Sequence, residues 1–101
     1  MNGAILIGNE RRRQQDEEKY SWEHDDLHTS GELANFACCY ALDPMGGDAS
    51  NMIKILKPEG WKLKLSCNGN TNDNLEGRIK DLVKAGALIV AEIERLYRRK
   101  G

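Results

Sequence analysis

The sequence predicts a mainly α-helical fold, a small bundle of three to four helices with a long C-terminal amphipathic helix and a short extended arm. Apolar residues recur at three- and four-residue steps over positions 74–99, which is the period of one helix face. Residues 10–19 consist almost wholly of strong helix formers. The length of 101 residues is close to the commonest domain size, so a single helical domain over residues 1–101 is expected.

The first helix is expected over residues 3–19. Residues 9–19 carry no continuous apolar stripe, so most of this helix should face solvent. Arg11, Arg12 and Arg13 fan out around it at about 100° per residue. At least one of them must therefore point toward the body of the fold, where a guanidinium needs a carboxylate or a phosphate.

A second helix is expected over residues 30–42. Thr29 followed three residues later by Glu32 fits a capping box, in which each side chain bonds the other's backbone N–H. The helix should end before Pro44, because a proline disfavours helix in the residue before it. Its apolar face comprises Leu33, Phe36, Ala37, Tyr40 and Ala41. Trp22 is the expected anchor of the polar segment that precedes this helix.

The middle of the chain predicts a short helix over residues 48–57, capped by Asp48 or Ser50, and then an extended arm over residues 61–65. The arm alternates apolar and polar residues, which is typical of a strand or an extended segment. One isolated strand is not stable alone. The arm must therefore pair with a partner chain or lie over helices.

The last helix is expected over residues 74–99, with Asn72 or Asp73 as its N-cap. Gly86 in its interior costs about 1 kcal/mol relative to alanine. Since Ala85 and Ala87 flank it, we expect another helix to approach closely there. The apolar positions of this helix are Leu75, Ile79, Leu82, Val83, Gly86, Ile89, Val90, Ile93, Leu96 and Tyr97.

The candidate site is the polar segment 23–33, which holds both histidines of the chain. Three interpretations stay open: side chains that cap and pack the helix entry, a ligand-binding site, or a metal or acid–base centre of imidazole and carboxylates. Guanidinium groups held by carboxylates suit recognition of a phosphate or a base, and the tryptophans offer stacking surfaces. The candidate ligand-binding residues are Arg11, Arg12, Arg13, Trp22, His24, Asp25, Asp26, His28, Glu32 and Trp61.

Composition narrows the classes of partner and compartment. The formal net charge of -1 provides no basic field, so nucleic-acid binding is not supported. The apolar segment near the N-terminus is too short for a signal peptide or a membrane span, so no membrane association is expected. The odd count of 3 cysteines is typical of a reducing compartment, and we expect a cytoplasmic protein.

The blocks ERRRQ at residues 10–14, EHDDLH at 23–28, GELA at 31–34 and DLVKAGALI at 81–89 resemble a family of small proteins encoded by tailed phages and prophages. The likeness covers nearly the whole chain, with the blocks in the same order. It implies a phage accessory protein in the cytoplasm of a bacterial host.

A second similarity is to all-α nucleotide pyrophosphohydrolases of the MazG type, whose first metal-binding motif the GELA block resembles. Asp81 is placed like their second acidic pair, although Lys84 stands at the partner position of that pair. This similarity implies Mg²⁺ or Mn²⁺ as the cofactor only if the chain is such an enzyme. The ligands would then be Asp25, Asp26, His28, Glu32 and Asp81.

The expected function is that of a phage or prophage accessory protein that binds a nucleotide-like or phosphorylated ligand, or a host factor, without turnover. Sequestration of a host defence signal is one use of such binding. The alternative is a divalent-metal-dependent nucleotide pyrophosphohydrolase. The small-residue patch around Gly86 and the polar first helix both indicate a homo-oligomer, with a dimer as the expected form.

Overall fold

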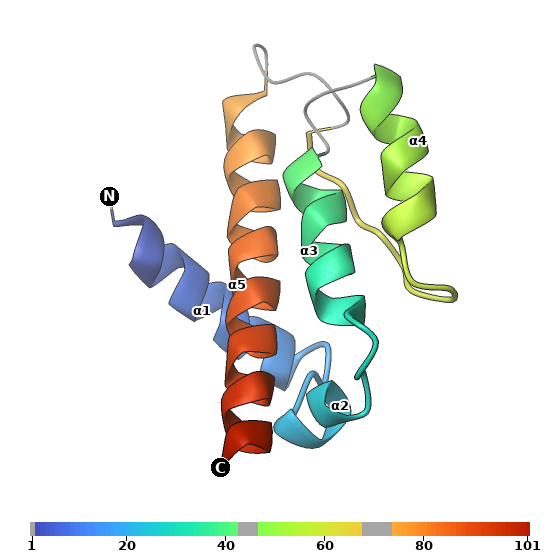
Figure 1. Ribbon diagram of the computed structural model, residues 1–101. Helices are drawn as coiled ribbons and strands as arrows, with labels where there is room; N and C mark the ends of the chain where they lie inside the picture. The colour runs from blue at the N-terminus through green and yellow to red at the C-terminus, as the bar shows by residue number, and fades with distance from the viewer. Residues whose placement is uncertain (1, 43–46, 68–73) are drawn as a thin grey trace.

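Helix α5 (Leu75–Lys100) runs the length of the molecule in the computed structural model, which describes residues 2–42, 47–67 and 74–101. Helix α3 (Glu32–Leu42) lies antiparallel beside it, and α4 (Gly47–Leu56) packs on the far side of α3 (Figure 1). Helix α1 (Gly3–Asp16) crosses α5 on the opposite side. The mainly α prediction is confirmed, with five helices in the described residues.

The core lies between α3 and α5. Helix α3 supplies the large side chains, whereas α5 supplies alanines and one leucine, so the two helices can approach closely. The apolar face predicted for the helix over 30–42 is the face that packs here. The cluster comprises Leu33, Phe36, Ala37, Tyr40, Ala85, Leu88 and Ala91, with Ala41 partly buried against it.

Helix α1 ends at Asp16, three residues before the predicted end. Lys19 has a φ of 62°, a left-handed conformation that a non-glycine residue rarely adopts in a helix. The backbone N–H of Tyr20 turns back to the carbonyl oxygen of Gln14, at 2.9 Å. This tight reversal brings the chain directly into α2 (Trp22–Asp26), a five-residue helix that the sequence pattern does not predict.

The predicted capping box at Thr29 is wrong, because α3 begins at Glu32 itself. The chain turns at Gly31, whose φ of 83° is accessible to glycine without a Cβ penalty. The Glu32 carboxylate still serves the helix entry, since it accepts the backbone N–H of Ser30 at 2.6 Å. Of the predicted pair, Glu32 therefore makes its hydrogen bond at the start of α3, whereas Thr29 does not cap the helix.

The arm over residues 61–65 lies extended over the helices and has no strand partner in the described part of the chain. Trp61, Leu63 and Leu65 pack against the core cluster, while Lys62 and Lys64 are exposed, as the alternation predicts. Helix side chains take the place of a neighbouring strand. The Lys64 N–H donates to the Tyr40 hydroxyl at 3.1 Å, and the Ser66 and Cys67 N–H groups each donate to the Asp81 carboxylate at 2.9 Å.

The N-cap of α5 is Asn74, whose side chain accepts the Gly77 N–H. The predicted caps Asn72 and Asp73 lie outside the described residues. The expected close approach at Gly86 is confirmed, because a Cβ on Gly86 would lie 2.6 Å from Cδ1 of Ile7 in α1. The helix that uses this glycine is thus the N-terminal one.

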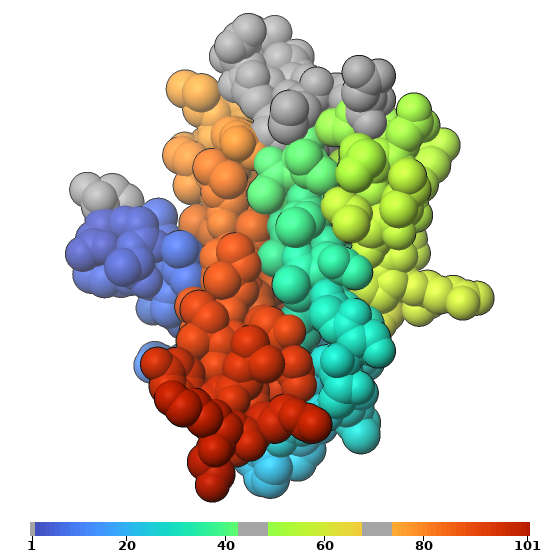
Figure 2. Space-filling model, viewed as in Figure 1, coloured from blue at the N-terminus to red at the C-terminus, as the bar shows by residue number. Residues whose placement is uncertain are grey.

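The apolar stripe predicted for the last helix does not face the core. Its members Leu75, Ile79, Leu82, Ile89, Ile93 and Leu96 are between 43% and 67% exposed. The buried side of α5 consists of Gly77, Asp81, Ala85, Ala87, Leu88, Ala91 and Arg95. In Figure 2, α5 lies uncovered between α1 and α3 along much of its length.

None of the helices in the three described segments combines the length and the apolar character of a membrane-spanning helix.

Candidate functional site

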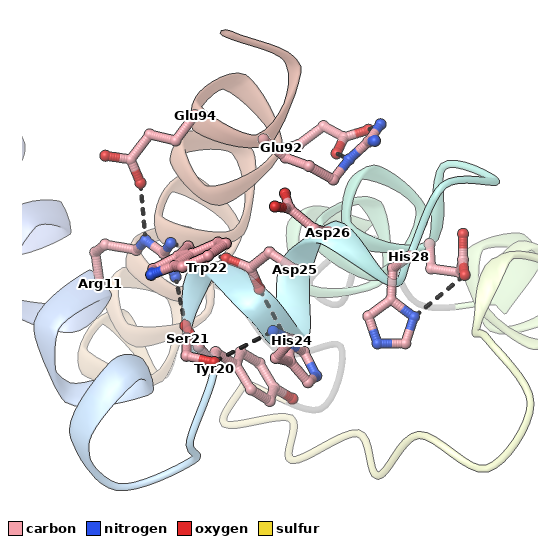
Figure 3. Close-up of polar contacts among 12 residues, drawn as sticks. Arg11, Tyr20, Ser21, Trp22, His24, Asp25, Asp26, His28, Glu92 and Glu94 are labelled. Atoms are coloured by element: carbon pink, nitrogen blue, oxygen red, sulfur yellow. Dashed lines mark hydrogen bonds and ion pairs between the residues drawn. The ribbon is translucent and has the colours of Figure 1, made fainter. Parts of the chain in front are cut away.

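A buried ion pair between Arg11 and Asp25 lies at the centre of the candidate segment (Figure 3). Arg11 Nη2 donates to Asp25 Oδ2 at 2.8 Å, with 7% of one side chain and 0% of the other exposed. The same guanidinium donates from Nη1 to the Tyr20 carbonyl oxygen at 3.3 Å and from Nε to Glu94 at 3.2 Å. Arg11 is therefore the arginine that turns inward, and it ties α1 to both α2 and α5.

The second carboxylate oxygen of Asp25 is also engaged. It lies 3.0 Å from Nδ1 of His24, and the His24 ring stacks on Tyr20 with centroids 4.5 Å apart and planes 4° apart. Burial raises the pKa of the Tyr20 hydroxyl, with the nearby Glu18 carboxylate acting in the same direction. The Asp25 carboxylate thus holds a cation on one side and an imidazole on the other.

A chain of aromatic rings runs from this pair into the core. His24 meets His28 at 4.7 Å between centroids, His28 meets Trp61 at 4.8 Å, and Trp61 meets Phe36 at 5.0 Å, each edge to face. Edge-to-face contacts at these separations are favourable for aromatic pairs. The polar segment is consequently anchored to the core through Trp61 of the arm.

The predicted anchor, Trp22, is wrong. Trp22, the first residue of the short helix α2, is 57% exposed and does not belong to the core cluster. It lines a surface hollow of about 370 Å³ whose other lining residues are Arg11, Gln15, Glu94 and Arg98. The Arg11–Asp25 pair and Trp61 anchor the polar segment instead.

His28 and Glu32 form their own pair, with Nδ1 of His28 3.2 Å from Oε2 of Glu32. Burial by itself raises the pKa of the Glu32 carboxyl, but hydrogen bonds from backbone N–H groups and from His28 outweigh it, so the pKa lies below its ordinary value. Asp26 pairs separately with Arg98 of α5, at 2.9 Å on a partly exposed surface.

The two remaining arginines leave the site. Arg12 is exposed, on the solvent side of α1. Arg13 lies against three glutamates, Glu10 at 2.8 Å and Glu17 and Glu18 at 3.2 Å each. The hydrogen bonds with Glu10 above all raise the pKa of Arg13. The three arginines therefore do not converge on one ligand.

The residues named for a metal site are engaged in separate contacts. Asp25 binds Arg11, Asp26 binds Arg98, and His28 binds Glu32. Asp81 is fully buried and accepts two backbone N–H groups of the chain segment after the arm. Among the residues that the structure describes, no group of three or more His, Cys, Asp or Glu side chains is arranged to hold a metal ion.

An open groove of about 310 Å³ lies beside the aromatic chain, between the turn after α1 and the arm. We call it the ring–lysine groove. Its walls combine three aromatic or imidazole rings with two lysines, and only His24 and Trp61 belong to the predicted ligand-binding residues. Its lining residues are Glu18, Tyr20, His24, Gly60, Trp61, Lys62 and Lys64.

A smaller recess of about 40 Å³ adjoins the groove, with Glu18, Tyr20, Lys62 and Lys64 common to both. Gln14 lines it, and its Oε1 is buried with no hydrogen-bond partner in the described residues. Lys84 also lines it and is held in place, since its Nζ donates to the Lys64 carbonyl oxygen at 3.1 Å and lies 5.3 Å from the Tyr40 ring centre.

Sequence reasoning missed Lys62, Lys64, Lys84 and Gln14. The arm itself carried a signal for the first two, because alternation places Lys62 and Lys64 on one side, opposite the partly buried Trp61. No sequence signal connects Lys84 or Gln14 with the arm, since α5 and α1 meet it only through tertiary packing.

No protein-family model matches this chain, and neither curated proteins nor solved structures gave a significant match.

Proposed function

We propose that this protein binds a small nucleotide-like ligand, with a planar base and a phosphate, in the ring–lysine groove and does not turn it over. The observation that supports this most directly is the shared lining of the groove, where Tyr20, His24 and Trp61 stand beside Lys62 and Lys64. Planar rings and mobile cations at one opening are the two parts that recognition of a nucleotide requires.

The rings would receive the base, with one edge of the base facing the recess. Tyr20 and Trp61 are each partly buried, which holds their planes in place before any ligand binds. Stacking of a base on an aromatic side chain contributes about 1–3 kcal/mol. At the inner end, the Gln14 Oε1 is an acceptor suited to an N–H of the base.

The lysines would receive the phosphate. Lys62 and Lys64 project into solvent from the arm, while Lys84 is fixed beneath them by its own hydrogen bond. The Glu18 carboxylate lies 3.8 Å from Lys64 Nζ, so the groove is not uniformly cationic. This mixed charge favours a compact phosphorylated molecule over a nucleic-acid strand, which needs a continuous basic track.

The resemblance to small phage proteins gives the proposal a setting, a bacterial cytoplasm during infection. A protein that holds a host signalling nucleotide without cleaving it would lower the free concentration of that signal and so counter a host defence. Binding in this setting needs no catalytic group in the groove, only affinity and abundance.

The test is titration of the purified protein with a panel of purine and pyrimidine nucleoside mono-, di- and triphosphates, with and without Mg²⁺ or Mn²⁺. Tryptophan fluorescence would report binding and mass spectrometry the state of the nucleotide. We expect at least one nucleotide to bind and be recovered intact. A charge-assisted hydrogen bond contributes about 1.5–3 kcal/mol, so Lys62→Ala with Lys64→Ala should weaken binding about tenfold or more.

The matched control is Lys80→Ala, an exposed lysine of α5 that does not line the groove, and it should bind like the natural chain. Release of pyrophosphate that Glu32→Ala abolishes would overturn the proposal in favour of the hydrolase. If no nucleotide binds at all, the groove is not a nucleotide site, and a host protein becomes the candidate partner.

A further inference from the structure

The outward side of α5 carries a stripe of exposed apolar residues that no other described helix covers. Six leucines and isoleucines, none less than 43% exposed, follow one side of the helix. Four of them, at positions 75, 79, 89 and 93, lie about 200° around the helix from a buried residue two positions away, as Ile79 does from Asp81 and Ile93 from Arg95. Helix α3 therefore cannot reach them, and α1 crosses beside them (Figure 2).

The spacing of the stripe is that of a two-helix seam. Positions 75, 79, 82, 86, 89, 93 and 96 are separated by alternating steps of four and three residues, the a and d positions of a heptad repeat. Isoleucine stands at the a positions 79 and 93, and leucine at three of the four d positions, so large aliphatic side chains fill the seam at every layer except that of Gly86.

The one interruption of the seam is filled from within the chain. Gly86 stands at an a position, and Ile7 of α1 occupies the place where its side chain would be, with Cδ1 2.6 Å from an ideal Cβ. Ile7 is only partly buried, so it still presents aliphatic surface at that layer. The seam is therefore continuous over 21 residue steps, about 32 Å at 1.5 Å per residue.

We propose that a second copy of this chain covers the stripe, so that α5 pairs antiparallel with α5 of the other copy in a two-fold homodimer. The patch around Gly86, which the sequence indicated as a reason for oligomerisation, is occupied by α1. The interface is instead the outward stripe. It is independent of the ring–lysine groove, whose lining residues include none of the stripe.

The charges of α5 favour the antiparallel arrangement. A parallel pair would place the cationic ends Arg98, Arg99 and Lys100 of both copies side by side. In the antiparallel pair, Leu82 faces Ile93 of the other copy, and Glu76 lies at that copy's cationic end. A hollow of about 200 Å³ lined by Ile93, Leu96, Tyr97 and Lys100 lies where Leu75 and Ile79 of the other copy would insert.

The size of the stripe sets the expected strength. A helix face of this length and roughly 10 Å width covers on the order of 300 Å², which is as large as the apolar patches that mark interaction sites. Two such faces together bury on the order of 600 Å², below the roughly 1,200 Å² at which stable specific interfaces begin, so a weak, reversible dimer with a Kd on the order of 10–100 μM is expected.

Sedimentation velocity of the full chain over roughly 1–500 μM, a range that brackets such a Kd, tests the pairing. We expect a monomer–dimer equilibrium in the natural chain and only monomer in the double variant Leu82→Glu with Ile93→Glu. Ile55→Glu, which alters an apolar residue of α4 that is 75% exposed, should dimerise like the natural chain. A natural chain that stays monomeric, or a folded double variant that still dimerises, overturns the proposal.

Cross-linking tests the pairing without a destabilising charge. In a background with the exposed Cys38 changed to serine, a Leu82→Cys chain is mixed with an Ile93→Cys chain and oxidised. The antiparallel pairing predicts disulfides between the two different chains. Disulfides only between identical Leu82→Cys chains would overturn the antiparallel arrangement, and no disulfide in either would overturn the interface.

Discussion

At the scale of single residues, Arg11 and Asp25 are the groups on which the polar segment depends. Each is almost fully buried, and the guanidinium meets acceptors from α2, from the turn before it and from α5. A buried ion pair of this kind contributes little more to stability than a well-packed apolar pair would. Loss of one member, however, leaves an uncompensated charge in a low-dielectric interior. The pair is therefore a structural requirement of the site.

Asp25→Ala is expected to lower the free energy of unfolding by about 3–5 kcal/mol, because it leaves the Arg11 guanidinium buried without its closest partner. Chemical denaturation monitored by circular dichroism would measure the change. The matched control is Asp26→Ala, which removes a partly exposed ion pair with Arg98 and should cost at most about 1 kcal/mol.

In the double variant Arg11→Met with Asp25→Ala, the loss should be smaller than the sum of the two single losses, since no charge remains buried. Equal effects of Asp25→Ala and Asp26→Ala would contradict the role assigned to the buried pair.

The sequence could predict that one of three consecutive arginines turns inward, but not which one. The answer depends on the rotation of α1 about its axis, which is set by the contact of Ile7 with Gly86 on a helix about 80 residues away in the chain. For the same reason, the sequence could not tell that Arg12 and Arg13 leave the site.

At the scale of elements, helix ends are decided by single side chains and glycines. Asn74 closes the start of α5 in two ways, since its Oδ1 accepts the Gly77 N–H and its Nδ2 donates to the Ser66 carbonyl oxygen, both at 2.9 Å. This couples the end of the arm to the first turn of the long helix. Gly77 lies between them, with no room for a side chain.

Gly77→Ala is expected to destabilise the protein by more than about 1 kcal/mol, although alanine is the better helix former by a similar amount. A Cβ there would lie 2.5 Å from the Ser66 carbonyl oxygen and 2.6 Å from Asn74 Nδ2, and the backbone atom cannot move aside cheaply. Thermal and urea denaturation would measure the change.

The control for this substitution is Gly8→Ala, in the interior of α1, where a Cβ meets nothing within 4 Å. It should stabilise the protein by about 0.5–1 kcal/mol, from helix propensity alone. Stabilisation by both substitutions would show that the contact at Gly77 relaxes without cost.

The ranges of the longer helices could be predicted to within three residues, because runs of helix formers and breakers act locally. Helix α2 was missed since five residues are too few to show a period. The capping box at Thr29 failed because the left-handed Gly31 delays the helix, and backbone conformation of that kind competes with a cap motif without changing the sequence pattern.

At the scale of the whole molecule, the arm connects the polar segment with the core. Trp61 joins the ring chain of the polar segment to Phe36 of the core, so residues far apart in sequence are held by one side chain. Trp61→Ala should therefore cost about 2–4 kcal/mol of unfolding free energy, somewhat below the loss for a fully buried tryptophan.

The chain supplies its own control for that loss, Trp22→Ala, which alters a tryptophan that is 57% exposed and should change stability by no more than about 0.5 kcal/mol. Urea denaturation monitored by circular dichroism avoids dependence on either fluorophore. A larger loss at Trp22 than at Trp61 would contradict the assignment of the anchor.

The mainly α class could be predicted from the sequence, but the direction in which α5 faces could not. A heptad pattern of leucine and isoleucine is equally typical of a helix face buried in the monomer and of a face that packs against another chain. The true core face is made of Gly77, Leu88 and alanines together with the buried Asp81 and Arg95, residues whose burial becomes visible only with the arm and α3 in place.

Helix α1, which has few apolar residues, is held at two points that lie four residues apart on one of its sides. Ile7 sits in the notch at Gly86, and Arg11 enters the buried pair. Both contacts can form together only because the two residues are about one helical turn apart and so lie on the same side of α1. An insertion or deletion of one residue between them would rotate one point about 100° from its partner, whereas a change of length before Ile7 would leave both in register.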